Sequence, residues 1–276
     1  MSNYYHGAKA SKQATSVSTP VVADSSIHLI VGTAPVHTVG GKVNEPVYAS
    51  NYAEAVAAMG YSDEWDKYDI CEEIYSSFKL YSNGPIVMVN VLDPAKHLKG
   101  EETVDKTLAG GITELPFEAV SGTVEVKGYD GEDSLTEKYT RGEDYDLFYA
   151  DGVLRLERIE SGKIKADNAK LNIKFNSVDP SKVTKKDIIG GYDTSTNKSS
   201  GFELVDSVYP KYRVIPTLFL APNFSTDSEV AAIMAAKAEN INGLFVGKAI
   251  IDADTTTVKT YSDVPKWKSD NNISQP

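Results

Sequence analysis

The sequence has a single cysteine, Cys71, among its 276 residues. One thiol cannot form an internal disulfide or supply the several sulfur ligands of a structural zinc site. Cys71 stands within a helical pattern, so we interpret it as a small buried apolar residue rather than as a nucleophile. The four histidines, His6, His28, His37 and His97, are not spaced as metal ligands, and none belongs to a nucleophile motif. We therefore predict no catalytic residue, no cofactor-binding residue, no cofactor and no metal site.

Positive charge is also scarce, with 28 lysine and arginine residues against 39 aspartate and glutamate residues and a net charge of −11. An acidic surface repels phosphate backbones, and Asp179 and Asp187 flank the one lysine cluster, Lys182, Lys185 and Lys186. We therefore expect no nucleic-acid partner. The N-terminus has no secretion signal, and the longest apolar runs are well short of a membrane span, so we expect no membrane partner either.

Short apolar runs that end at turn residues are present instead. Ile27 to Val31 and Ile86 to Leu92 have the pattern of strands buried in a parallel sheet that helices cover. His28 begins the first of these strands, where we interpret it as a satisfied strand-edge residue. Asn51 or Ser50 can cap a helix that runs to Met59, and a four-residue apolar spacing predicts a longer helix over 66–81. The predicted fold class is α/β, a mixed sheet with flanking helices.

Alternating strands replace these runs from about residue 101. Asp151-Gly152 and Ser161-Gly162 are hairpin signals between such strands, and a Gly/Ser/Thr-rich stretch at 190–201 has the composition of a linker. The sequence therefore predicts that an antiparallel β module, 101–199, interrupts the α/β domain. A loop tolerates such an insertion when its two ends lie close together.

The α/β pattern returns after residue 200. It predicts a short helix that Pro210 ends, a strand from Val214 to Leu220, a helix with a capping box at 226–229, and a strand from Leu244 to Ile251. We therefore divide the chain into three regions. They are an extended N-terminal arm (1–24), a discontinuous α/β domain (25–100 plus 200–276) and the inserted peripheral module (101–199). The segment 261–276 is predicted to be polar and turn-like.

Two glycine-containing loops were considered as nucleotide sites. Gly32-Thr33-Ala34-Pro35 follows a strand, but it lacks the further glycines of a dinucleotide loop, and Pro35 blocks the turn. Gly40-Gly41-Lys42 lacks the following hydroxyl residue and the upstream strand of a phosphate loop. We interpret the first as a strand end and the second as a flexible surface loop.

Two acidic segments were considered as cation sites. Asp252 and Asp254 follow a predicted strand, where two carboxylates at this spacing can hold a divalent cation, but they also match ordinary strand-end caps, which we prefer. The segment Asp130-Gly131-Glu132-Asp133 lacks the remaining ligands of a calcium loop, so we interpret it as a solvated turn.

Several blocks, taken in order, resemble the contractile tail sheath proteins of bacteriophages and related injection machines. They are Tyr4-Tyr5-His6-Gly7, Leu29 to Pro35, the helix from Ala53 to Gly60, Gly84 to Val91, Pro216 to Ser225, and Ala249 to Ala253. In that family, identical subunits form helical rings around a tube and exchange terminal arms by strand addition. The resemblance implies a structural, non-enzymatic subunit of a virion tail, assembled in the bacterial host cytoplasm and functioning in viral genome ejection. The implied partners are other copies of the subunit, the tail tube protein and the baseplate.

The resemblance also implies that about residues 2–26 form the exchanged arm and that a tube-facing domain follows residue 276. We therefore expect this chain to behave as a soluble, mostly monomeric fragment. Two alternatives stay open: an α/β small-molecule enzyme or nucleotide binder, and a module that binds carbohydrate. The second would use aromatic side chains of the 101–199 module, namely Tyr129, Tyr139, Tyr145, Phe148 and Tyr149.

Overall fold

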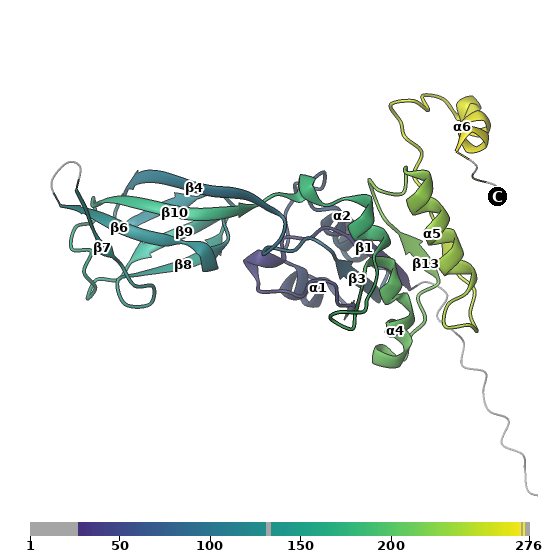
Figure 1. Ribbon diagram of the computed structural model, residues 1–276, viewed down its shortest axis with the longest axis horizontal. Helices are drawn as coiled ribbons and strands as arrows, with labels where there is room; N and C mark the ends of the chain where they lie inside the picture. Colours follow the sequence, from purple (N-terminus) through teal and green to yellow (C-terminus); the bar gives the residue numbers. More distant parts are fainter. Residues whose placement is uncertain (1–26, 131–133, 272, 274–276) are drawn as a thin grey trace, which may run out of the picture.

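The computed structural model describes residues 27–130, 134–271 and 273. The predicted N-terminal arm, 1–24, lies outside the described residues. A compact α/β body carries the β module on one side, while α6 lies apart on the other side (Figure 1).

A five-stranded mixed sheet organises the α/β body. Its strand order is β14 (Lys248–Ala249), β13 (Leu218–Leu220), β1 (His28–Gly32), β3 (Ile86–Asn90) and β2 (Val47–Ala49). The first four strands are parallel, and β2 pairs with β3 in the antiparallel sense. The predicted fold class, an α/β fold with a mixed sheet, is confirmed.

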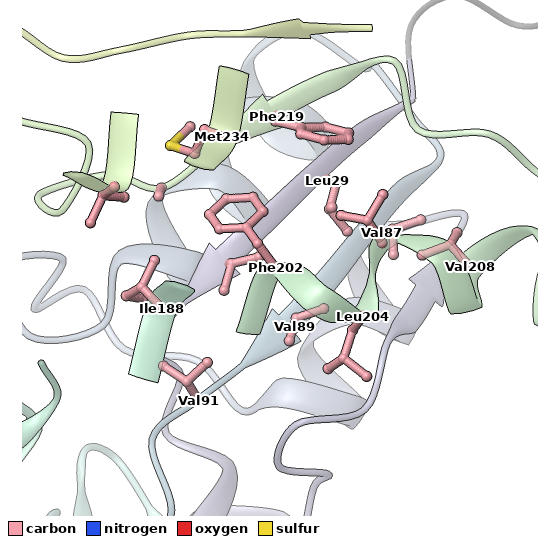
Figure 2. Close-up of a cluster of buried hydrophobic side chains, with 14 of the residues drawn as sticks. Leu29, Val87, Val89, Val91, Ile188, Phe202, Leu204, Val208, Phe219 and Met234 are labelled. Carbon is pink, nitrogen blue, oxygen red and sulfur yellow. The ribbon is translucent and has the colours of Figure 1, made fainter. Parts of the chain in front are cut away.

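Helices cover both faces of this sheet because alternate residues of the central strands are apolar on both sides. On the face of Ile30 and Met88 lie α1 (Tyr52–Met59), α2 (Asp69–Tyr75) and the π-helical turn Ser76–Leu80 that continues α2. On the face of Leu29 and Val87 lie α3 (Lys185–Ile189), α4 (Val205–Tyr212) and α5 (Ser228–Glu239). Figure 2 shows this second face, where Phe202 lies beside Phe219 with ring centroids 6.1 Å apart.

The inserted module consists of two antiparallel sheets with a core of their own. One sheet has the order β4 (Leu98–Thr107), β10 (Lys170–Val178), β6 (Glu125–Asp130), β7 (Ser134–Lys138); the other has the order β5 (Ile112–Leu115), β9 (Val153–Arg158), β8 (Tyr145–Ala150). Leu154 and Leu156 of one sheet and Ile173 and Phe175 of the other lie in the same buried cluster. The Asp151-Gly152 turn joins β8 to β9 as predicted. The Ser161-Gly162 hairpin is wrong, because this segment connects β9 to β10, which belong to different sheets.

The predicted linker at 190–201 is also wrong, because it contains a hairpin of β11 (Gly191–Asp193) and β12 (Lys198–Ser200). Before it, Val183 and Ile188 are buried in the core of the α/β body. The division of the chain into domains stays a proposal, and this packing places the return to the α/β body near residue 180.

The second half of the α/β body differs from the prediction in local detail. Pro210 lies inside α4, which continues to Tyr212 and is closed by Arg213 in the left-handed conformation. A proline removes one N–H donor from a helix. The loss is tolerated here because α4 ends two residues later, at Tyr212. The predicted capping box at 226–229 is wrong, because Asp227 caps α5 by accepting from the N–H of Glu229 at 2.9 Å.

The C-terminal segment is more ordered than the sequence suggests. A 3-10 turn, Tyr261–Asp263, leads into α6 (Val264–Asp270). Thr260 and Asp263 form a capping box, with each side chain accepting from the other residue's backbone N–H. The polar composition of this segment predicts turns, whereas this capping box supplies the hydrogen bonds that start the helix.

An aromatic cluster, which we call the joint, attaches the module to the α/β body. It consists of His37 and Tyr68 from the body and Phe117 and Tyr149 from the module, with ring centroids 5.6 to 6.2 Å apart. The Nε2–H of His37 donates to the carbonyl oxygen of Phe117 at 3.0 Å, and burial lowers the pKa of His37. Lys67 pairs with Glu118 at 2.8 Å on its outer side. The joint therefore combines apolar contact with polar contacts.

Candidate interaction surface at the open edge of the sheet

The β14 strand forms an edge of the central sheet, and its described pairing is with β13 alone. The N–H groups of Lys248 and Ile250 donate to the carbonyl oxygens of Thr217 and Phe219, at 2.7 and 3.0 Å. Because backbone groups alternate in direction along a strand, those of Ala249 and Ile251 point away from the sheet. This edge is therefore a template on which another strand can pair.

Exposed apolar side chains surround this edge. Leu244 is 81% exposed, Val246 is 72% exposed and Ile250 is 47% exposed. The sequence predicts a strand from Leu244 to Ile251, and the structure forms it only over Lys248–Ala249. A turn, in which Leu244 and Phe245 donate to the carbonyl oxygen of Ile241, delays the strand until Lys248. The apolar residues that suggest a strand are present, but no described residue covers Leu244 or Val246 enough to bury them.

A shallow groove runs between α5 and the outer edge of β14. It has a volume of about 140 Å³, and small residues line it, among them Ala235, Ala238, Gly247 and Ala249. At Gly247 a Cβ atom would lie 2.7 Å from the carbonyl oxygen of Thr217, so glycine permits the close approach of this segment to β13. Small side chains beside an unpaired edge leave room for the backbone and short side chains of an added strand.

One face of the sheet is only partly covered beside this edge, because Leu220 packs against the cluster of α1 and α2 while Ile250 is exposed. We call it the uncovered face and define it as Leu218, Leu220 and Ile250, which share one side of β13 and β14 by strand register. α5 packs on the opposite side of both strands. Leu218 and Leu220 are only half-buried, and Ile250 is exposed. The uncovered face and the open edge form one continuous surface.

Ligands of α/β proteins bind at a topological switch point of the sheet. In this fold, such a point lies at the carboxyl ends of β1 and β13. A hollow of about 280 Å³ lies there, with Thr33, Asp69 and Asn223 in its lining. The N–H of Thr33 donates to the Asp69 carboxylate at 2.6 Å, and the N–H of Ala34 donates to Asn90 Oδ1 at 2.9 Å. The backbone amides that a phosphate would need are therefore already satisfied, one of them by a carboxyl group.

Asp69 is buried at the start of α2 and is not among the functional residues that the sequence predicts. Burial raises the pKa of Asp69 to about 7, against the opposing effect of the Thr33 N–H. A Cβ atom at Gly32 would lie 2.1 Å from Asp69 Oδ1, so glycine is needed for the contact. An acidic residue at the start of the predicted helix, after a strand ending in glycine, was the available signal. We interpret the Asp69 side chain as a structural link between the end of β1 and the start of α2.

Asp252 and Asp254, the two candidate cation ligands, have hydrogen-bond partners within the protein. Asp252 accepts from the Ser225 hydroxyl at 2.8 Å, a contact between two loops, whereas Asp254 accepts from the nearby Thr256 N–H at 2.8 Å, as a cap does. In the described part of the chain, no three His, Cys, Asp or Glu residues are grouped as ligands of a metal ion. Cys71 is buried, and burial raises the pKa of its thiol to about 12, which keeps it protonated.

The histidines lie in three different environments within the described residues. The Nδ1 atom of His28 lies 2.6 Å from Glu73, and His37 belongs to the joint. His97 accepts from the N–H of Asp93 at 2.9 Å, and burial lowers its pKa. His6 lies outside the described residues, as does most of the acidic turn 130–133.

The aromatic residues considered for carbohydrate binding do not gather on one surface. Tyr145 is buried in the module core, and the hydroxyl of Tyr149 donates to the carbonyl oxygen of Ala119 at 2.6 Å within the joint. Tyr129 donates to Asp105 at 2.6 Å, and Tyr139 packs against the core. Phe148 is exposed on β8. None of the described helices has the length and apolarity needed to cross a membrane.

The fold is an α/β body with an inserted β module. Its open edge at β14 is a surface on which a strand of another polypeptide can pair. These features are typical of a structural or interaction protein. A comparison with known proteins agrees. The chain is 27% identical over 257 residues to a tail sheath protein of Burkholderia phage BcepMu, a match that spans 92% of this chain and 50% of the relative. This match confirms the resemblance and supports assignment of the chain to the tail sheath family. The chain spans half the length of this curated relative. No family model matches it.

Proposed function

We propose that this chain is a structural subunit of a contractile tail sheath, in a phage or a phage-like injection particle. It polymerises around a tail tube and contracts during injection, with other copies of itself, the tube protein and the baseplate as its partners. Its location is the virion tail. The open edge at β14, with exposed apolar residues on both sides, is the observation that supports this proposal most strongly.

Assembly of this kind needs strand addition rather than catalysis. An incoming strand satisfies the outward backbone groups of Ala249 and Ile251 and covers Val246 and Ile250, which water otherwise contacts. Residues 2–26 are the proposed arm that links neighbouring subunits. The inserted module lies on the side of the body opposite to α6 (Figure 1), which leaves it free to decorate the outside of an assembly.

Contraction then requires no local chemistry. An extended assembly that is metastable relaxes to one in which neighbouring subunits bury more surface, and the difference in interface free energy drives the movement. In this proposal the strands exchanged between subunits stay paired throughout the movement.

Electron microscopy of the complete protein tests the proposal. The complete chain is expected to form tubes, and deletion of Ser2 to Ser26 is expected to abolish them while circular dichroism shows a folded monomer. Ala249→Pro removes one outward N–H without touching the bonds to β13, and it is expected to reduce tube formation in the same assay. Normal tubes from the deletion variant would refute the assignment of the arm.

A further inference from the structure

The inserted module meets the α/β body at two contacts, and a buried histidine lies at each of them. The first contact is the joint, where His37 of the body packs against Phe117 and Tyr149 of the module. The second, which we call the crossing, is the place where the chain leaves the body into β4 and returns from β10. There the carbonyl oxygen of His97 accepts from the N–H of Asp179 at 2.8 Å.

The hydrogen bonds of His97 fix its ring in the neutral form. The Nδ1 atom accepts from the N–H of Asp93 at 2.9 Å, so the ring proton is on Nε2. A second proton, on Nδ1, would point at the N–H of Asp93, and two donors cannot share one hydrogen bond. Protonation of His97 therefore requires the turn between Asp93 and His97, in which the His97 N–H donates to the Asp93 carbonyl oxygen at 2.8 Å, to open.

His37 is neutral in the joint for a related reason. Its Nε2–H donates to the carbonyl oxygen of Phe117 at 3.0 Å, so Nδ1 is the atom that would take a second proton. This Nδ1 atom is buried and has no hydrogen-bond partner among the described residues. A buried charge is costly unless it is both paired and hydrogen-bonded. Protonation of His37 therefore favours a state in which the joint is open to water.

The charged and titratable groups around the two rings do not supply the missing partners. Glu118 of the module faces His37, but it already pairs with Lys67 at 2.8 Å. Asp187 of α3 lies beside the crossing and already pairs with Lys96 at 2.6 Å. Burial outweighs the attraction of both carboxylates and lowers the pKa of both histidines. The remaining groups are the hydroxyls of the joint, whose pKa values burial raises, and two charges at the crossing: Tyr68, Tyr149, Asp93 and Lys182.

We propose that His37 and His97 form an acid-sensitive latch, which holds the inserted module against the body while both rings are neutral and frees the module to move when both are protonated. The pKa of each histidine is lower than 6.5 while the latch is closed. The latch is therefore complete above about pH 6.5 and weakens as the pH falls. It concerns two parts of one chain and does not depend on the proposed function.

Distances between two spin labels test the latch. Labels at Leu135→Cys on β7 and Tyr209→Cys on α4 report the position of the module relative to the body, because both native side chains are exposed while Cys71 is buried. The distance distribution is expected to be narrow at pH 7 and at least twice as broad at pH 5. An unchanged distribution between these pH values would overturn the proposal.

Two substitutions remove the titration and keep the hydrogen bonds. His97→Asn offers an amide oxygen where Nδ1 accepts, and His37→Gln offers an amide N–H where Nε2 donates. The double variant is expected to keep its pH 7 distribution at pH 5. His28→Asn is the matched control, because the Nδ1 atom of His28 lies 2.6 Å from a carboxylate, that of Glu73, and it should broaden as the unsubstituted chain does. Full broadening in the double variant, or its loss in the control, would overturn the latch.

Amide hydrogen exchange shows where the chain opens. Protection factors of the Asp93 and Asp179 N–H groups, which both bond to His97, are expected to fall at least tenfold between pH 7 and pH 5. Those of Val91 in the body and Tyr139 in the module, which bond within their own parts, are expected to stay unchanged. An equal fall at all four would mean that the whole chain unfolds, and it would overturn the latch.

Nitrogen NMR of the unsubstituted chain tests the latch without any variant. Both rings are expected to be neutral Nε2–H tautomers at pH 7, with titration midpoints below 6.5. A charged ring at pH 7, or the Nδ1–H tautomer in either histidine, would overturn the proposal.

Discussion

The two edges of the central sheet are finished in different ways. At the β2 edge, Tyr212 of α4 stacks on Tyr48 with centroids 5.6 Å apart, its hydroxyl donates to the carbonyl oxygen of Pro46 at 2.7 Å, and Lys211 pairs with Glu45 at 2.6 Å. At the β14 edge, no described helix lies outside the strand, and Val246 and Ile250 are exposed. Among the described residues, the chain thus covers one edge with its own side chains and leaves the other unpaired.

The largest effect is expected from Asp69, which closes the carboxyl end of the sheet between these edges. Its pKa is raised from 3.8 to about 7, so the folded chain binds a proton that the unfolded chain releases above pH 4. This stabilisation is complete below about pH 4 and is lost as the pH rises through 7. Three pKa units correspond to about 4 kcal/mol. Urea unfolding of Asp69→Asn at several pH values is expected to lack this contribution.

Asp254→Asn, near the open edge, should change the pH dependence of the free energy of unfolding in the opposite direction. Hydrogen bonds from Thr256 lower the pKa of the exposed Asp254, so its small stabilisation is present above pH 4 and is lost as the pH falls. Parallel pH profiles of Asp69→Asn and Asp254→Asn would contradict the view that the first carboxylate is buried and the second is solvated.

An intermediate effect is expected at the closed β2 edge. Tyr212→Ala removes the ring that stacks on Tyr48 and leaves the carbonyl oxygen of Pro46 with Lys211 Nζ, at 3.0 Å, as its remaining donor. The free energy of unfolding is expected to fall by about 2 kcal/mol, because the ring is only half-buried. Tyr212→Phe, the control, keeps the ring and should lose about half as much. Equal losses in both variants would assign the whole effect to the hydroxyl.

The smallest effect on stability is expected at the open edge. Val246 is 72% exposed, so Val246→Ser should change the free energy of unfolding by less than about 0.5 kcal/mol. Because Val246 contributes to the proposed contact surface, the same variant should still weaken assembly of the complete protein in sedimentation assays. A loss of unfolding free energy comparable to that of Tyr212→Ala would show that Val246 packs as well as Tyr212, and the two edges would then not differ.

The regular parts of the fold were predictable from local pattern. β1, β3 and α1 follow the expected residues closely, since apolar runs and the Asn51 cap act over a few positions. Ser161-Gly162 and the capping box at 226–229 failed, because several local motifs compete there and tertiary packing selects one. The open edge was expected only in general form. Leu244 and Val246 belong to the predicted strand, but they precede β14 in the structure and are exposed because no described residue covers them.

Amide hydrogen exchange at Ala249 and Ile251 tests the central claim most directly, comparing the isolated chain with the assembled complete protein. The account predicts fast exchange in the isolated chain, where these N–H groups point away from β13, and protection in the assembly, where another strand accepts them. Strong protection in the isolated chain, or fast exchange that persists in assembled tubes, would contradict it.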